Sequence, residues 1–576
     1  MKVEEYFILL REYYREYKSW DEIEVTLNEV SNILLCTKRN SRLVLNKLSD
    51  LNLLKWNPGK GRGNKSTLVF LSYPEDLVFN VIIDLASKGN LSTSYRYLSF
   101  QTTPQKVKMK YKEWLDEQLG VKHYVEKGKS IDVIKVPIYT KIQSLEPSKV
   151  FYGPMKHILT NIFDNLVTFN YQTNNPEPHI AHYWDVSNKD LTWTIYLRKG
   201  VFFHNGKELT SDDVIVSINR IINSEYPLKY TSFLGIKQLE SVHNYCFKIH
   251  LYKPNSLLLH FFSQPEFSIL PSKHISEEDS EVIGTGPYQL LSNKNNVLIL
   301  GAFQYYFKER PHIDKLEIWS FPNDKNMAIT NSDIIFNPPE EITRNLGSWK
   351  SFSTQISKML IFNSTKINSP LLNKSIRKII STSLNIETLI DLGNSKKKED
   401  LGANIDGYNG ELISIYTTTT NEREMEWIKI EFNKLSINAK LEQISPDELY
   451  RADVYLKADI IISGFSFDYS KEISILTLIF KFFGLFTIEV QESIQKQLDL
   501  VKSSYNPNLR KKSYDKIFMI LKENYCIKTL YKKQIDTKMD SSILWNDNQT
   551  SNLIDFRNIW IKNTDTCSSI NKSTNG

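Results

Sequence analysis

Cysteine is scarce in this sequence, with four among 576 residues. The four stand far apart, at positions 36, 246, 526 and 567, and none belongs to a Cys-x-x-Cys pair. This spacing argues against a disulfide framework and against a cysteine-based zinc site. We expect reduced thiols, most of them buried.

The sequence also shows no pattern typical of a secretory leader or of a membrane-spanning helix. The first twelve residues carry acids at positions 4, 5 and 12, whereas a secretory signal needs a basic start and an apolar core of about 7–15 residues. The longest apolar stretch, 473–488, is interrupted by Lys481 and Gly484 and is shorter than the ~20 residues of a spanning helix. The sequence therefore predicts a cytoplasmic protein that does not insert into a membrane.

Catalytic patterns are absent as well. The chain has no Gly-x-Ser-x-Gly elbow, and no paired carboxylates or Cys/His set at a useful spacing. His179 and His182 are spaced like metal ligands but lie in a proline-led coil. We therefore expect neither an enzyme nor a bound metal or cofactor.

One near match to a phosphate-binding loop runs from Gly59 to Ser66, with Asn64 in place of the second glycine. Such a loop must lead into a helix, whose N-terminus holds the phosphate. Here an apolar, β-branched run follows, which is typical of a strand. A nucleotide-hydrolysing enzyme is thus the weakest of three readings of this chain.

Length and composition favour a large soluble protein. At ~150 residues per domain, 576 residues allow several domains, and 41% hydrophobic with 24% charged residues is ordinary for globular chains. The formal net charge is +6, so the chain as a whole is no polycation. The distribution of charge therefore matters more than its sum.

The most patterned stretch runs from Pro178 to Ile222. Residues 191–197 alternate apolar and polar, which predicts a half-buried strand, and a second short strand is expected around 201–203. Thr210 and Asp213 form a capping pattern before a helix with an apolar stripe. The stretch reads as strand, strand and helix of an α/β lobe.

This stretch resembles the signature of the family 5 extracellular solute-binding proteins, the oligopeptide- and nickel-binding class. The matching residues are Pro178, Ala181, Trp184, Ser187, Leu197, Arg198, Gly200, Val201, Phe203, His204, Gly206, Asp213 and Val214. Gly284-Thr-Gly-Pro-Tyr288 matches a further loop of the family. The resemblance implies a two-lobed ligand binder and leaves the ligand open.

The resemblance also suggests ligand-binding residues. Residues 459–469 are similar to the family's Gly-Trp-x-x-Asp-Tyr segment, whose acid holds the amino terminus of the ligand in peptide-binding members. Asp468 takes that place, and Phe465 replaces the tryptophan. Asp468, Phe465 and Tyr288 are thus candidate ligand contacts, and a purely structural loop is the alternative for each.

The N-terminal part has the order of a winged helix-turn-helix. A capping pattern at Thr26 opens a short helix, Thr37 can cap a second helix over 38–51, and a glycine-rich turn joins two strands between 53 and 71. The second helix is expected to turn Val44, Leu48 and Leu51 inward. Residues 74–126 read as helices of a connector with no function of its own apparent.

Basic residues concentrate in this part. Residues 26–70 hold eight bases against two acids. Basic residues on a recognition helix and on a wing suit double-stranded DNA, because the helix enters the major groove and the wing meets phosphates. The predicted DNA-binding residues are Lys38, Arg39, Ser41, Arg42, Asn46, Lys60, Arg62 and Lys65. A helical module with solvated lysines is the alternative.

Residues 26–30, 35–42, 45–48 and 56–64 resemble the N-terminal domain of the SgrR-type transcriptional regulators, in which such a domain precedes a family 5 solute-binding domain. The resemblance implies a winged helix-turn-helix domain with its connector over 1–125 and a two-lobed α/β domain of the periplasmic-binding-protein type over 130–562. Lobe one would cover about 130–357 and 500–562 and lobe two about 358–499, before a disordered tail over 563–576.

We therefore expect a DNA-binding transcription regulator in the cytoplasm that senses a small solute. The resemblance suggests a sugar phosphate, and a peptide or a metal chelate also fits the class; a homodimer stays open. The alternative is a transport-linked solute-binding protein whose N-terminal module contacts a protein partner. Cell fractionation distinguishes the two hypotheses.

Overall fold

The computed structural model describes most of the chain. The described residues are 2–59, 65–126, 128–138, 141–142, 144–150, 153–170, 172–223, 233–272, 282–321, 334–336, 350–384, 407–418, 422–445, 448–466, 470–545 and 555–562. The predicted disordered tail, 563–576, therefore lies outside them.

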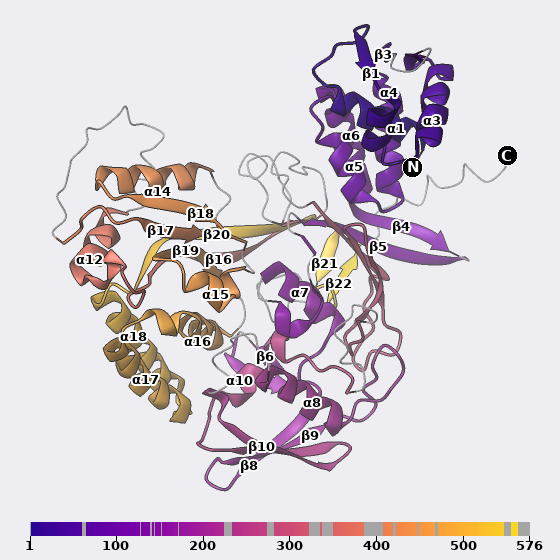
Figure 1. Ribbon diagram of the computed structural model, residues 1–576. Coiled ribbons are helices and arrows are strands. Elements are labelled where there is room, and N and C mark those ends of the chain that lie inside the picture. Colours follow the sequence, from indigo (N-terminus) through magenta and orange to yellow (C-terminus); the bar gives the residue numbers. More distant parts are fainter. Residues whose placement is uncertain are drawn as a thin grey trace.

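The N-terminal domain is a winged helix-turn-helix, as the sequence predicts (Figure 1). Its elements are α1 (Val3–Tyr13), β1 (Glu22–Val25), α2 (Leu27–Ile33), α3 (Lys38–Asp50), β2 (Leu54–Asn57) and β3 (Ser66–Phe70). The strands form a small antiparallel sheet in the order β1-β3-β2. We call residues 2–73 the reader and the β2–β3 hairpin its wing.

Both predicted caps of the reader are present. The Glu29 backbone N–H donates to Thr26 Oγ1 at 3.1 Å, and the Asn40 N–H donates to Thr37 Oγ1 at 3.3 Å. These bonds satisfy N–H groups that the first turn of a helix leaves open. They fix where α2 and α3 begin, and so the turn between them.

Three helices and one strand follow the reader and form the connector: α4 (Glu75–Ser87), α5 (Leu91–Leu98), α6 (Gln105–Gln118) and β4 (Gly120–Glu126). The sequence analysis predicted helices alone here and missed β4. This strand pairs antiparallel with β5 (Lys129–Ile138) over its whole length. The connector therefore ends inside a sheet of the next domain.

That sheet has the order β12-β13-β14-β5-β4 and two differently covered faces. Its other strands are β12 (Tyr288–Lys294), β13 (Val297–Ala302) and β14 (Lys315–Ser320). Val297 and Trp319 lie opposite each other on one face and share a core with the reader and the helices of the connector. Leu298 and Ile318 lie on the other face, in the core of lobe one.

The stretch with the family signature builds a second sheet, in the order β10-β11-β9-β8. Its elements are β8 (Ala181–Ser187), β9 (Thr192–Leu197), β10 (Ile236–His243), β11 (Cys246–Leu251) and the helix α8 (Ser211–Ile222). The predicted alternation is confirmed, since Trp193, Ile195 and Leu197 are buried. The expected second strand at 201–203 is reduced to one bridge between Phe202 and Glu208.

Short elements connect these two sheets. They are η1 (Pro147–Lys149), α7 (Gly153–Ile162), β6 (Val167–Asn170), β7 (Asn175–Pro178), α10 (Leu258–Phe262) and η2 (Pro265–Phe267). Strands β6 and β7 pair antiparallel. Figure 1 shows α7 between the five-stranded sheet and the region of β6, α8 and α10.

A six-stranded sheet of order β15-β20-β16-β19-β17-β18 combines strands from the ranges expected for both lobes. The strands are β15 (Ile334–Phe336), β16 (Lys350–Phe362), β17 (Ile413–Thr417), β18 (Ala439–Gln443), β19 (Ile460–Ser466) and β20 (Ile527–Met539). The two long strands, β16 and β20, pair at twelve positions from Lys350–Met539 to Ile361–Ile527. They run from the side of lobe one into lobe two (Figure 1).

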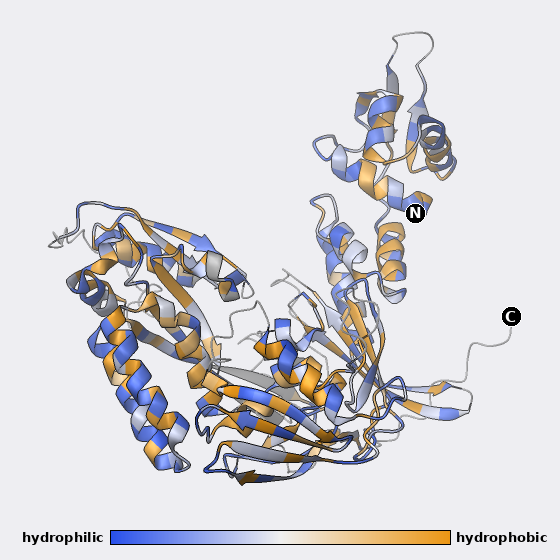
Figure 2. Cartoon of the chain, turned by 60° about the horizontal axis from the view of Figure 1, so that its bottom comes forward, coloured by the Kyte–Doolittle hydropathy of each residue, from blue (hydrophilic) through white to orange (hydrophobic). Residues whose placement is uncertain are grey.

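Helices pack around this sheet, and the stretch 471–523 near the C-terminal end of the chain is mostly helical. They are η3 (Pro370–Leu372), α12 (Lys374–Ser383), α14 (Glu422–Lys434), η4 (Glu448–Tyr450), α15 (Ala452–Tyr455), α16 (Lys471–Phe482), η5 (Phe483–Leu485), α17 (Ile488–Ser503) and α18 (Pro507–Glu523), followed by the pair β21 (Ile543–Trp545) and β22 (Ile559–Ile561). Figure 2 shows hydrophilic and hydrophobic residues mixed along the long α17–α18 pair, as expected for helices with one buried side.

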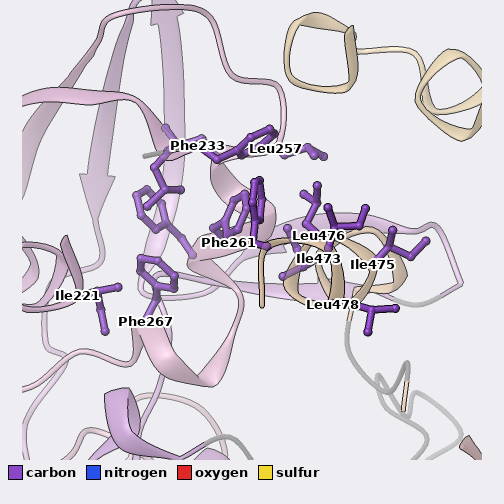
Figure 3. Packing of buried hydrophobic residues seen from close by; sticks show 14 of the residues in the cluster. Ile221, Phe233, Leu257, Phe261, Phe267, Ile473, Ile475, Leu476 and Leu478 are labelled. Atoms are coloured by element: carbon purple, nitrogen blue, oxygen red, sulfur yellow. The ribbon is translucent and has the colours of Figure 1, made fainter. Parts of the chain in front are cut away.

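The largest core joins the signature region to α16. Phe233, Leu257 and Phe261 pack in one buried cluster with Ile473 and Leu476 (Figure 3). The rings of Phe233 and Phe480 are 5.3 Å apart. The apolar stretch that is too short for a membrane thus forms a buried helix, and no described helix is long and apolar enough to cross a bilayer.

Candidate nucleic-acid interface and solute-binding site

Helix α3 presents a basic side to solvent. Lys38, Arg39, Arg42 and Asn46 are exposed, whereas Val44 and Leu48 are buried in the core of the reader. Arg39 and Arg42 form no ion pair with a carboxylate in the described chain, and Asn46 follows Arg42 by about one helical turn. Two guanidinium groups and an amide therefore remain available on one accessible side.

Ser41 has to be removed from the predicted DNA contacts. Its side chain is completely buried, its hydroxyl donates to the Thr37 carbonyl at 3.1 Å, and its Oγ lies 3.2 Å from Cys36 Sγ. A serine can face a core in a helix because it can bond the carbonyl four residues earlier. The expected inward position of Leu51 is also wrong, since Leu51 is 50% exposed and Leu45 is buried instead.

The wing is only partly described. Lys60 and Arg62 lie outside the described residues, so their predicted role stays a prediction. Lys65 lies at the start of β3 with its side chain 60% exposed, and its Nζ is 2.8 Å from Glu24 Oε2. Since Ser66 begins a strand, the phosphate-loop reading lacks the helix that it requires.

Two exposed apolar residues of the reader escaped the sequence analysis. Leu35, in the turn between α2 and α3, is 92% exposed with φ = 49°, and Trp20 is 65% exposed with φ = 76°. Positive φ is uncommon for bulky residues, so both positions are conformationally costly. Lys55 Nζ lies 6.0 Å from the centre of the Trp20 ring. Counting charged and apolar residues in the sequence cannot reveal that these two side chains are exposed, because the backbone angles at both positions determine it.

Two family motifs of the solute-binding domain, one containing His204 and the other Gly284 and Gly286, are joined by hydrogen bonds. The His204 backbone N–H donates to the Gly284 carbonyl at 2.9 Å, the Gly284 N–H lies 3.3 Å from His204 Nδ1, and His204 Nε2 lies 3.0 Å from the Gly286 carbonyl. Burial lowers the pKa of His204. A neutral ring that donates from Nε2 and accepts at Nδ1 satisfies both contacts.

Asp164 is the centre of a buried polar network behind these motifs. Its carboxylate lies 2.7 Å from His179 Nε2, 3.2 Å from the Tyr306 hydroxyl and 3.2 Å from Thr285 Oγ1. Burial raises the pKa of Asp164, but the contact with His179 together with nearby Arg557 and Lys308 leaves this pKa lowered, while burial lowers the pKa of His179. An ionised Asp164 thus accepts from a neutral His179, which accounts for this histidine without a metal.

Metal binding has no support elsewhere in the described parts of the chain. No group of three His, Cys, Asp or Glu side chains there is arranged to hold an ion. Cys36, Cys246 and Cys526 are free, and burial raises the pKa of Cys526 to about 11. A thiol with so high a pKa is an inert core group.

The structure places the three predicted ligand contacts in different environments or leaves them outside the described residues. Tyr288 is fully buried in lobe one, where its hydroxyl donates to the Phe556 carbonyl at 3.1 Å, so it is removed from the candidate set. Asp468 lies outside the described residues. Phe465 is half-buried near the end of β19, with its ring 5.7 Å from that of Phe482 and 5.4 Å from Lys481 Nζ.

Lys481 is a residue whose role the sequence analysis did not recognise, although it interrupts an apolar run. Its side chain is 9% exposed on α16, and burial together with Lys156 holds its pKa well below the usual range. Lys156 on α7 forms an ion pair with Glu266. Lys481 therefore lies near the candidate residue Phe465, and Lys156 of lobe one lies close enough to Lys481 to lower its pKa.

Comparison with known families agrees with both parts. Residues 2–123 match the model of the sugar transport-related sRNA regulator N-terminal domain, and residues 175–410 match that of the bacterial extracellular solute-binding proteins, family 5, middle. The first match covers the reader and nearly all of the connector. The second includes the signature stretch and the first strand of lobe two.

Individual relatives match longer stretches of the chain. The uncharacterized protein YhjP of Bacillus subtilis is 29% identical over 501 residues, which cover 83% of this chain and 84% of that protein. The HTH-type transcriptional regulator SgrR of Escherichia coli K12 is 31% identical over 301 residues, or 52% of this chain and 51% of the regulator. The chain thus spans about half the length of the SgrR regulators that it matches.

Solved structures share the fold of the larger part. The periplasmic binding protein DppA from Helicobacter pylori, in complex with a peptide, has a TM-score of 0.64 at 21% identity and covers 75% of this chain and 98% of its own. The murein tripeptide binding protein MppA of Escherichia coli has a TM-score of 0.62 at 17% identity, with 74% and 98% covered. The chain therefore carries, in this order, a domain that matches the N-terminal domain of the SgrR-type regulators and a domain that matches the family 5 solute-binding proteins.

Proposed function

We propose that the chain is a cytoplasmic transcription regulator that binds double-stranded DNA through α3 and the wing. A small solute bound between the two lobes regulates this binding. The observation that carries the proposal is the exposed side of α3, where Arg39, Arg42 and Asn46 stand without a carboxylate partner in the described chain. Similarity to the SgrR regulators supports the same assignment.

The chemistry of this side suits base reading in the major groove. Arginine can donate two parallel hydrogen bonds to guanine, and asparagine can bond adenine in the same manner. Lys38 at the first turn and Lys65 on the wing would neutralise phosphates, together with Lys60 and Arg62. Lys65 pairs with Glu24, and Lys88, Lys106 and Lys110 on the connector likewise each pair with an acid.

The solute would bind where segments of both lobes meet. Phe465 ends β19 in lobe two, Lys481 on α16 lies over its ring, and Lys156 comes from α7 of lobe one. These groups offer an aromatic surface and two amino groups, and Asp468 adds an acid of the segment that follows β19. A sugar phosphate, a peptide and a metal chelate all remain candidates for this combination.

Binding of the solute would act on DNA through the arrangement of the lobes. A ligand that contacts both lobes stabilises their closed arrangement, and it changes DNA affinity only if the two arrangements differ in that affinity. The long strands β16 and β20 are the segments through which such a movement would pass. The reader, which shares a core with the five-stranded sheet, would move together with lobe one.

Replacement of Arg39 and Arg42 by Ala in the full chain tests the DNA assignment. A labelled duplex from the region upstream of the chain's own gene is titrated, and anisotropy is recorded at several salt concentrations. Removal of each base contact is expected to cost about 1–3 kcal/mol. The affinity should therefore fall by at least ~30-fold, and if either arginine also binds a phosphate, its removal would flatten the salt dependence.

A matched control removes the same charge elsewhere. Lys106 and Lys110 lie on α6 and pair with Glu75 and Asp76, so their replacement by Ala should leave duplex affinity nearly unchanged. If the Arg39/Arg42 variant binds the duplex as tightly as this control at every salt concentration, α3 is not the DNA-binding element.

A further inference from the structure

We propose that two copies of the chain pair through β4 to form a dimer. The two strands would run antiparallel about a twofold axis at Tyr124, and the two five-stranded sheets would become one. The partner surface is thus the same edge of a second copy. The inference concerns assembly and stands on the geometry of the β4–β5 hairpin, independently of what the reader binds.

The hairpin projects beyond the rest of its sheet. Strand β14 pairs with β5 from Val133 to Ile138, whereas β4 pairs with β5 from Lys129 to Lys135. Residues 124–126 and 129–131 therefore extend as a two-stranded ribbon, which Figure 1 shows clear of the body. Among the described strands, β5 is the one that pairs with β4.

The end of β4 carries apolar groups in an exposed position. Val125 is 77% exposed and Tyr124 is 38% exposed. Native proteins protect protruding edge strands with proline, with inward charges or with a covering segment, because an open apolar edge recruits another strand. Strand β4 has no proline, and its exposed tip has β-branched and aromatic residues, which favour pairing.

Charge selects one register for the pairing. With the axis at Tyr124, Lys122 of each copy lies opposite Glu126 of the other, and the two Tyr124 rings face each other. Lys122, Tyr124 and Glu126 all lie on the same face of β4, since strand residues alternate. Glu126 Oε1 already accepts from Lys315 Nζ at 2.9 Å, which leaves Oε2 for the lysine of the second copy.

Neighbouring registers lack this complementarity. An axis at His123 would set His123 against itself and Lys122 against Tyr124, and an axis at Val125 would set Tyr124 against Glu126. Neither arrangement opposes two unlike charges. Unlike charges directly across strands stabilise a pair, and like charges destabilise it. A self-complementary edge of this kind is what a twofold contact requires.

The dimer would place both readers on one side. A twofold axis between antiparallel neighbours runs perpendicular to the sheet, so each face of the joined sheet is continuous. The face with Val297 and Trp319 carries the reader and connector in each copy. The two readers would thus lie on the same side of the joined sheet, as two half-sites on one duplex require.

Charge exchange tests the pairing in solution. Sedimentation of the full chain gives the dissociation constant of the dimer. K122E sets Glu against Glu twice, and E126K sets Lys against Lys twice, so each variant should weaken the dimer by about 10-fold or more. The double variant K122E/E126K restores unlike pairs and should recover most of the affinity. If the double variant dissociates as readily as the singles, the proposed register is wrong.

Cysteine cross-linking gives an independent measure, in a background with Cys36 and Cys567 replaced by Ser. Tyr124→Cys places two thiols directly opposite, with Cα atoms about 4.5–5.5 Å apart, within the range for a disulfide. Val125→Cys is the matched control, because it lies opposite His123 and about 8 Å from its own copy. Mild oxidation should therefore cross-link the Tyr124 variant and leave the Val125 variant monomeric.

The two experiments together decide the proposal. A wild-type chain that sediments as a monomer at tens of micromolar, or cross-linking that is equal at positions 124 and 125, overturns it. A dimer that K122E and E126K leave intact also overturns it, because the contact then lies elsewhere. Deletion of 563–576 should leave the dimer unchanged; a dimer that depends on this segment would contradict pairing through β4 alone.

Discussion

His260 shows what burial does to a single titratable side chain in this protein. It lies on α10 with 5% of its surface exposed and its ring 5.7 Å from that of Phe169, and neither ring nitrogen has a hydrogen-bond partner in the described chain. Burial lowers the pKa of His260 to about 4, against a smaller opposing effect of Glu472. The ring is therefore neutral at pH 7 and costs stability when acid favours its charged form.

This histidine predicts a dependence of stability on pH. Its pKa is lower in the folded state than the ~6.5 of the unfolded chain, so the unfolded chain binds the proton first as the pH falls. Its contribution is complete above pH ~6.5 and is lost progressively down to pH ~4, by about 3 kcal/mol in total. Urea unfolding from pH 4 to pH 7.5 measures it. His260→Phe should flatten the curve in this window; a curve of unchanged slope would contradict the assignment.

Individual positions are the least predictable part of the sequence reading. Helical periodicity correctly placed Arg39, Arg42 and Asn46 on the exposed side of α3. Once the apolar residues define the buried side of a helix, the residues opposite them must be exposed. It could not tell that Ser41 bonds the Thr37 carbonyl and is buried. It also could not tell that the chain packs Leu45 inward and ends α3 before Leu51. Such choices depend on the neighbouring elements rather than on local spacing.

Among the elements, the loop before β12 and the end of α7 fit closely together. A Cβ at Gly286 would lie 2.7 Å from the carbonyl oxygens of Asn161 and Ile162, and the Gly286 N–H donates to the Ile162 carbonyl at 3.0 Å. The sequence identified this glycine as part of the Gly-Thr-Gly-Pro-Tyr motif. The structure gives a physical reason for it, which is the close approach of two backbone segments.

Gly286→Ala should therefore lower the free energy of unfolding, since backbone atoms cannot move aside cheaply. Overpacking of this kind costs about 1–3 kcal/mol. Gly301→Ala is the matched control, because its Cβ would meet the end of the Leu291 side chain, which can rotate away. Thermal unfolding of both variants measures the difference. A Gly286 variant that melts with the control would show that α7 and the loop are not in contact.

Elements with strong local signals were predicted well, and one without them was missed. The strand 192–197 shows clear alternation, and α2 and α3 begin at threonine caps, so each was evident in the sequence. Strand β4 follows directly after α6 and carries Lys122, His123 and Glu126, which do not alternate with apolar residues clearly. Its pairing with β5 is what makes it a strand.

At the scale of the whole molecule, the connector packs on the solute-binding domain and shares its core with the reader. Trp319 and Phe321, from the region of β14, share a core with Tyr111 and Leu115 of α6. The five-stranded sheet thus has the helices of the connector on one face and lobe one on the other. The simplest expectation for two fused domains is a flexible linker. In this chain the packed helices of the connector join them instead.

Trp319→Ala should accordingly destabilise α6 and β14 together. Removal of a buried tryptophan costs about 3–5 kcal/mol. Hydrogen exchange followed by mass spectrometry would show faster exchange in both elements. Tyr305→Ala, at a side chain 74% exposed, is the control and should leave both elements protected. Faster exchange in β14 with an unchanged α6 would mean that the connector does not depend on this face.

The order of the domains was predictable because each domain carries a motif of many residues at fixed spacing. The contact between the two domains was not predictable. Sequence patterns identify a reader and a two-lobed domain separately, whereas the shared core depends on Val297 and Trp319, which are far from the reader in the sequence. The candidate ligand site is predictable only as a region, since Phe465 and Lys481 come together through packing of β19 against α16.

We propose that solute binding and DNA binding are coupled in one molecule. The most direct measurement is duplex affinity of the full chain with and without a solute that raises its melting temperature, chosen from sugar phosphates, peptides and metal chelates. The account predicts a change of affinity by about 5–150-fold, with the duplex changing solute affinity by the same factor. A solute that binds tightly and leaves duplex affinity unchanged would contradict it.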